Sequence, residues 1–131
     1  MTQTISAEKS FNTLLFIGLG IAFWVAGVLL IRFVGTPLFD HSHPWLLPLF
    51  VASIPVYWVI VKMFAVVGQV SGADLLRAIS LSSVTAAVLD GIALTWFPGL
   101  YGLEQAGLLL AAAWLIYAFG VGLGIAYWVS R

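Results

Sequence analysis

The sequence has 131 residues, of which 63% are apolar and 8% charged, and its formal net charge at pH 7 is zero. Soluble domains carry about 25% charged residues, so this chain lacks the polar surface that a soluble domain needs. The balanced charge excludes the basic surface of nucleic-acid-binding proteins. The absence of cysteine excludes disulfides, thiolate nucleophiles and iron–sulfur clusters. We therefore predict an all-α integral membrane protein.

Four apolar segments are long enough to cross a bilayer, which takes about 20 apolar residues. They comprise residues 12–34, 45–67, 73–97 and 105–129. We expect the first helix to end before Pro37, because proline cannot continue a helix. The connections are short and leave no room for a soluble catalytic domain. The sequence thus predicts one domain, residues 1–131, folded as a bundle of four transmembrane helices.

Basic residues predict the orientation of this bundle. Four of them lie on the side of the N-terminus, and Arg32 alone lies on the other side. The four are Lys9, Lys62, Arg77 and Arg131. Because cytoplasmic flanks of membrane helices carry an excess of lysine and arginine, we expect both termini to be cytoplasmic.

Small residues recur at a four-residue spacing in the first and fourth segments. In the first segment the row is Gly18, Ala22 and Ala26. The fourth segment has two neighbouring rows, Gly120 with Gly124, and Ala118 with Gly122 and Ala126. Small residues let helix backbones approach closely where lipid removes the usual hydrophobic drive. We expect these positions to pack helices, either within the molecule or between subunits.

The third segment is the one with an ionisable residue deep inside it. Asp90 lies about seven residues, or roughly 10 Å, before the end of the segment. A charged side chain at such depth costs about 3 kcal/mol on insertion scales, so it faces protein or water and indicates a functional site. Ser80, Ser83 and Asp90 fall within about a third of the helix circumference, together with Ala86 and Ala87. We expect this polar seam to be buried.

Arg32 lies near the end of the first segment, in the same half of the predicted bilayer as Asp90. A long arginine side chain reaches several ångström along a helix surface. We therefore predict that Arg32 is the partner of Asp90, with Ser83 or Thr95 as a weaker hydrogen-bonding candidate.

The first connection contains Asp40, His41 and His43, whose side chains supply metal-ligand atoms. The spacing is loose and no second ligand pair is in sight, so we predict a solvated loop and no metal, with His41 and His43 as the candidates for metal or pigment ligation. Six tryptophans and nine phenylalanines offer contacts to lipid, quinone or pigment. Such residues are typical of the aromatic belts of membrane helices, so we predict no cofactor.

Two classes of function fit these features. We favour a small membrane subunit that acts through helix packing, either as an accessory part of a larger complex or as a homo-oligomer; its partners are then the lipid bilayer and other membrane proteins. The alternative is a small proton- or cation-coupled transporter or channel that uses Asp90. We predict no enzyme, because Ser80 and His43 should lie toward opposite sides of the membrane and cannot form a hydrolase triad with Asp90.

The run from Val88 to Gly99 places Leu89-Asp90 several residues before Phe97-Pro98 at the end of the third segment. In this arrangement the chain resembles a bacterial family of small four-span integral membrane proteins of unknown function. The resemblance implies the same four-span fold and a bacterial inner or internal membrane, and it implies no activity.

Overall fold

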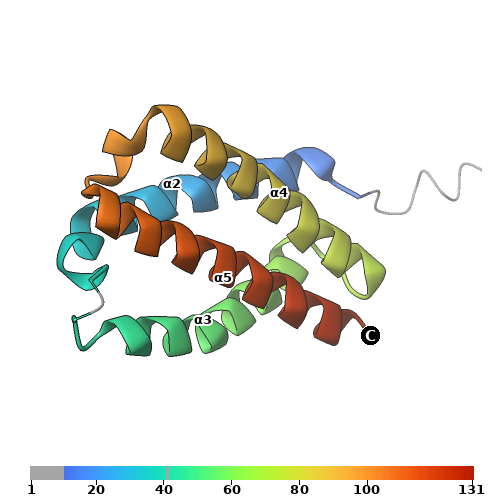
Figure 1. Cartoon of the computed structure of the whole chain (residues 1–131). Coiled ribbons are helices and arrows are strands. Elements are labelled where there is room, and N and C mark those ends of the chain that lie inside the picture. Colours follow the sequence, from blue (N-terminus) through green and yellow to red (C-terminus); the bar gives the residue numbers. More distant parts are fainter. Residues whose placement is uncertain (1–10, 41) are drawn as a thin grey trace, which may run out of the picture.

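Four long helices make up the structure, a computed structural model that describes residues 11–40 and 42–131 (Figure 1). The helices are α2 (Thr13–Leu38), α3 (Leu46–Val67), α4 (Ala73–Trp96) and α5 (Gln105–Ser130), and a short 3-10 turn, η1 (Pro98–Tyr101), follows α4. Each of the four is long and apolar enough to cross a membrane. The prediction of an all-α fold with four such helices is confirmed.

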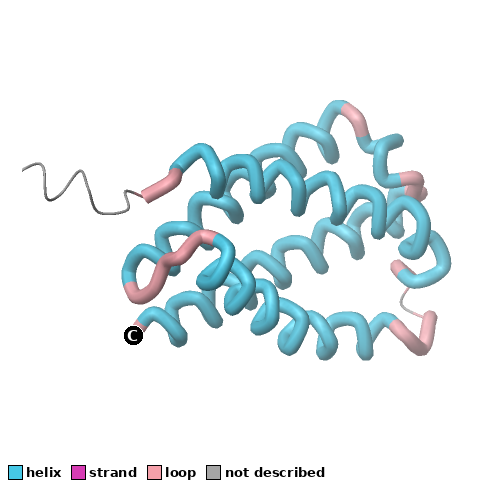
Figure 2. The backbone as a smooth tube through the Cα atoms, turned by 180° about the vertical axis from the view of Figure 1, so that it is seen from behind, coloured by secondary structure: helices cyan, strands magenta, loops and turns pink. Residues whose placement is uncertain are grey.

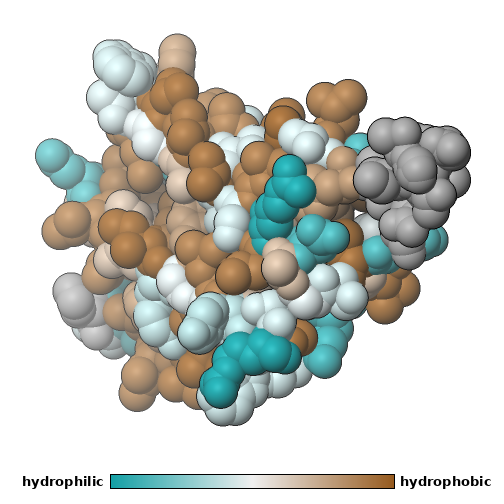
Figure 3. All heavy atoms as spheres, turned by 90° about the vertical axis from the view of Figure 1, so that its right-hand side faces the viewer, coloured by the Kyte–Doolittle hydropathy of each residue, from teal (hydrophilic) through white to brown (hydrophobic). Residues whose placement is uncertain are grey.

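The helices lie in two pairs, and the two helices within each pair run in the same direction (Figures 1 and 2). One pair is α2 with α4 and the other is α3 with α5, and contacts between α4 and α5 join the pairs. The backbones of the consecutive helices α2 and α3 stay apart, and the Phe64 ring of α3 stacks on Phe16 and Phe23 of α2 near the termini. The described chain begins and ends at the same end of the bundle, and Figure 3 shows hydrophilic side chains among the hydrophobic ones on that end.

The ends of α2 are set by local contacts. At its start the Asn12 side chain accepts a hydrogen bond from the Leu15 N–H at 3.1 Å, which caps the helix. At its end the helix continues through Pro37 to Leu38, so the predicted end before Pro37 is wrong. Proline removes one backbone donor but leaves the others, and the Phe39 N–H closes the turn on the Gly35 carbonyl at 2.9 Å.

Two buried clusters fill the bundle, one toward each end. Near the termini the first cluster is built around Phe16, Phe64 and Leu75. The second cluster, at the other end, is built around Ile31 and Tyr101. The pockets described below are lined in part by residues of these two clusters.

The buried face of α4 differs from the predicted polar seam. It comprises Leu75, Ala78, Ile79, Ser82, Ala86, Asp90 and Ala93. Ser80 and Ser83 are only partly buried and Ala87 is exposed, so the true face is rotated toward Ser82. The cause is the close approach of α2, where the Ser82 hydroxyl donates a hydrogen bond to the Phe16 carbonyl at 2.6 Å.

Of the small residues predicted to pack helices, those in the row with Gly122 do so within the molecule. A Cβ atom at Gly122 would lie 2.9 Å from the Tyr57 ring, and the neighbouring Ala118 and Ala126 are buried. The other five positions are exposed, so of the two predicted alternatives they leave packing between subunits; they are Gly18, Ala22, Ala26, Gly120 and Gly124. Their packing between subunits stays a prediction.

Gly20 makes the closest approach between α2 and α4. A Cβ atom at this position would lie 2.7 Å from the Ser82 carbonyl oxygen and 2.8 Å from the Thr85 Cβ atom. Neither atom is the end of a flexible side chain, so the helices would have to move apart.

Replacing Gly20 with alanine should therefore destabilise the protein by about 1–3 kcal/mol, the usual cost of overpacking. Gly18→Ala is the matched control, because a Cβ atom there meets nothing within 4 Å. Thermal unfolding in detergent, followed by circular dichroism, measures both variants. Equal melting temperatures for the two would contradict the predicted contact.

Candidate functional site

The carboxylate of Asp90 is paired with the hydroxyl of Tyr101. The Tyr101 hydroxyl donates a hydrogen bond to Asp90 Oδ1 at 2.6 Å. Asp90 is 7% exposed and Tyr101 is fully buried, so the pair is closed to its surroundings. A hydrogen bond to a carboxylate is shorter and roughly twice as strong as one between neutral groups. Asp90, the one charged side chain on the buried face of α4, thereby receives a hydrogen bond from within the chain.

The turn after α4 brings Tyr101 to this position. Pro98 begins η1, and Gly102 ends it with a φ of 69°, a left-handed conformation that glycine adopts without strain. The chain therefore folds back along α4 after Trp96. Burial raises the pKa of Tyr101, and the hydrogen bond to Asp90 raises it further, so the phenol keeps its proton and acts as the donor.

Arg32 binds the same turn and does not reach Asp90. Its Nη1 atom donates to the carbonyl oxygens of Gly99 at 2.9 Å and Leu100 at 3.1 Å. The predicted pairing of Arg32 with Asp90 is therefore wrong. A partly solvated guanidinium reaches these carbonyls at a lower desolvation cost than it would incur at a buried carboxylate.

The weaker candidates for binding Asp90 are wrong as well. Thr95 donates to the Gly91 carbonyl of its own helix at 2.7 Å. Ser83 lines a separate pocket, together with Tyr57. Tyr101 lies outside the long helices, so the helical spacing that singles out Asp90 does not indicate it. The signal was the Phe97-Pro98-Gly99 turn, which returns the next polar side chain toward the helix that it follows.

Trp24 completes the surroundings of the pair. Its indole lies beside both Asp90 and Tyr101. In the described part of the chain the buried indole N–H makes no hydrogen bond. Trp24 thus closes the α2 side of the pair by packing, while Tyr101 provides the hydrogen bond.

Other buried hydroxyls also join helices. The Ser82 hydroxyl bonds α4 to the Phe16 carbonyl of α2, as described above. The Ser53 hydroxyl of α3 accepts a hydrogen bond from the Trp114 indole of α5 at 2.9 Å. With the contact between Asp90 and Tyr101, these bonds link each pair of helices and fasten η1 to α4. The buried polar groups therefore act as internal cross-links.

The connection between α2 and α3 has local hydrogen bonds. His43 Nδ1 accepts from the Trp45 N–H at 3.1 Å, and Asp40 Oδ1 accepts from both the N–H and the hydroxyl of Ser42. His41 lies outside the described residues. Among the residues that are described, no three histidine, cysteine or acidic side chains gather as a metal site would require.

Comparison of the chain with protein-family models, with curated proteins and with solved structures found no match. Membership of the bacterial four-span family stays a prediction. The structure nevertheless gives a physical reason for the spacing between Leu89-Asp90 and Phe97-Pro98. With this spacing, a turn at Pro98 returns Tyr101 to the level of Asp90.

Removing the Tyr101 hydroxyl should destabilise the protein. We expect Tyr101→Phe to cost about 1.5–3 kcal/mol, because it leaves a buried carboxylate without its donor. In a double-mutant cycle with Asp90→Asn, the combined loss should be smaller than the sum of the two single losses by more than about 0.5 kcal/mol. Unfolding free energies in detergent give all four corners of the cycle.

The control for this cycle replaces Tyr101→Phe with Tyr127→Phe, since Tyr127 is an exposed phenol on α5. Its effect should add to that of Asp90→Asn within about 0.5 kcal/mol. Additive losses for Tyr101→Phe and Asp90→Asn would show that the two groups are energetically independent and would contradict the predicted coupling.

Proposed function

We propose that this chain is an integral membrane protein that acts through helix packing and carries out no catalysis. Its four helices span the bilayer with both termini in the cytoplasm, in a bacterial inner or internal membrane. It serves either as an accessory subunit of a larger membrane complex or as a homo-oligomer. The length and apolar composition of the four helices support the placement in a membrane.

The closure of Asp90 by Tyr101 carries this proposal. An aspartate that exchanges a proton or cation needs a path from water, whereas Asp90 is almost fully buried with one oxygen bonded to a buried phenol. The Arg32 guanidinium is likewise engaged by the carbonyls of η1. The polar groups that first suggest transport are thus used to hold the fold, which favours a structural role over the alternative of a transporter.

The outer faces of α2 and α5 support association with other helices. Gly18, Ala22 and Ala26 are exposed on α2, and Gly120 and Gly124 are exposed on α5. A Cβ atom at any of the three glycines would meet nothing within 4 Å. Rows of small residues at this spacing let membrane helices from different chains pack closely.

Native mass spectrometry after gentle detergent extraction tests this proposal. We expect a defined assembly, either of several copies or with other subunits, whose stoichiometry does not change across preparations. Gly18→Leu combined with Gly124→Leu should dissociate the assembly without lowering the melting temperature, because both side chains point away from the bundle.

The matched control is Ala87→Leu, which enlarges an exposed small residue on α4 outside the two rows. Its assembly should be unchanged. A chain that stays monomeric in every extraction would contradict the proposal. In that case, proton-coupled flux in liposomes that is lost in Asp90→Asn would establish the transporter.

A further inference from the structure

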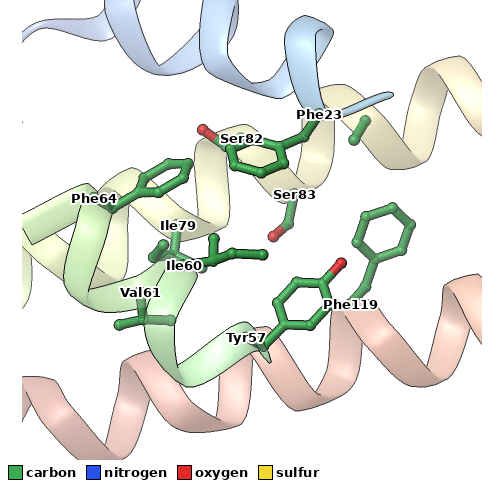
Figure 4. A pocket seen from close by; sticks show the side chains of 11 residues that line it. Phe23, Tyr57, Ile60, Val61, Phe64, Ile79, Ser82, Ser83 and Phe119 are labelled. Carbon is green, nitrogen blue, oxygen red and sulfur yellow. The ribbon is translucent and has the colours of Figure 1, made fainter. Parts of the chain in front are cut away.

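A pocket lies near the middle of the bundle, where helices α2, α3, α4 and α5 meet. Four aromatic rings line it, those of Phe23, Tyr57, Phe64 and Phe119 (Figure 4). Its volume is about 50 Å³. Ser83 faces the rings from α4, and no charged side chain is among the lining residues.

Two hydroxyls without a protein partner are the unusual feature of this pocket. Figure 4 shows the oxygens of Tyr57 and Ser83 directed into the space between α3 and α4. Within the described residues, neither hydroxyl makes a hydrogen bond, unlike those of Ser53 and Ser82. Leaving such groups unpaired in an apolar interior is unfavourable, so they call for a polar partner that the chain itself does not supply.

The pocket opens into a groove between α2 and α3. A second cavity of about 250 Å³ shares Phe23 and Tyr57 with the first, and a third of about 70 Å³ continues it toward Phe39. Together they follow α2 from Phe23 to Leu38, which is roughly 22 Å at 1.5 Å per residue. Ala26 and Gly27 leave the α2 wall of this groove open.

The depth of the hydroxyls restricts what can bind there. Tyr57 and Ser83 lie near the midpoints of α3 and α4, hence close to the centre of a hydrocarbon core about 30 Å thick. The headgroup and ester carbonyls of a phospholipid stay at the membrane surface and do not reach this level. The ligand must therefore carry an uncharged polar group that enters hydrocarbon, and a long apolar chain that fills the groove.

We propose that this site binds a lipid-soluble quinone or its quinol. The ring lies at the junction of the first two cavities, where the aromatic side chains of Phe23 and Tyr57 line both. The ring oxygen that points inward exchanges hydrogen bonds with the Tyr57 and Ser83 hydroxyls, and the apolar tail follows the groove between α2 and α3. The site needs only the proposed placement of the helices in a bilayer, and of the small residues proposed to pack against other helices it shares Ala26 alone.

Binding of decylubiquinone to the purified full-length chain tests this site. Quenching of tryptophan fluorescence reports binding, since Trp114 lines the groove. We expect saturable binding, weakened about tenfold by Tyr57→Phe or by Ser83→Ala, the loss expected for one hydrogen bond. Tyr127→Phe and Ser80→Ala, which change hydroxyls outside the site, should bind as the unmodified chain does.

A second variant tests the contribution of the groove to binding separately from that of the hydroxyls. Gly27→Leu should abolish binding by filling the groove while the fold is kept, because a Cβ atom at Gly27 meets nothing within 4 Å. Gly18→Leu enlarges an equally open position of α2 outside the groove and should bind normally. Melting temperatures measured without ligand confirm that each variant is folded.

Three results would overturn the proposal. No saturable binding would mean that water or a side chain of a second copy satisfies the hydroxyls. Equal affinity for decane or for phospholipid would mean that the groove takes apolar tails only. Unchanged affinity in Tyr57→Phe and Ser83→Ala would place the ligand elsewhere. Each result leaves the assembly measured by native mass spectrometry untouched, so the two proposals fail separately.

Discussion

The buried carboxylate of Asp90 is the constraint on which the structure depends. A charged oxygen in an apolar interior needs a donor, and the Tyr101 hydroxyl supplies it at 2.6 Å. That contact requires the chain to turn back immediately after α4, which η1 does. Arg32 then fastens the carbonyls of the turn to α2. One polar requirement thus ties together α2, α4 and the connection to α5.

Buried hydrogen bonds also explain why the bundle is divided into two pairs of helices. Ser82 and Ser53 each join a pair of helices through a single hydrogen bond, so α2 is held to α4 and α3 to α5. Stacked rings of Phe16, Phe23 and Phe64 hold α2 to α3 near the termini, and the groove opens between these helices beyond them. Among the described residues, pairing is incomplete at the buried indole N–H of Trp24 and at the pocket hydroxyls of Tyr57 and Ser83.

The helices and the importance of Asp90 could be predicted from the sequence. Long apolar runs are local features, and an acidic residue deep inside one of them stands out without a structure. The partner of Asp90 could not be read in the same way, because the contact with Tyr101 depends on the path of a turn. Small residues lie on several faces of α2, so the sequence does not show which of them contacts α4. That Gly20 makes this contact and Gly18 does not depends on how α2 is rotated about its own axis.

The central claim is that Asp90 is closed by Tyr101 and serves the fold. Labelling the protein in membranes with a lipid-soluble carbodiimide, followed by peptide mass spectrometry, measures directly whether this carboxyl is accessible. The exposed Glu104 is the internal standard. We predict that Glu104 is modified while Asp90 is not, and that Asp90 becomes reactive in Tyr101→Phe. Modification of Asp90 in the unmodified chain, at the rate seen in Tyr101→Phe, would contradict the claim.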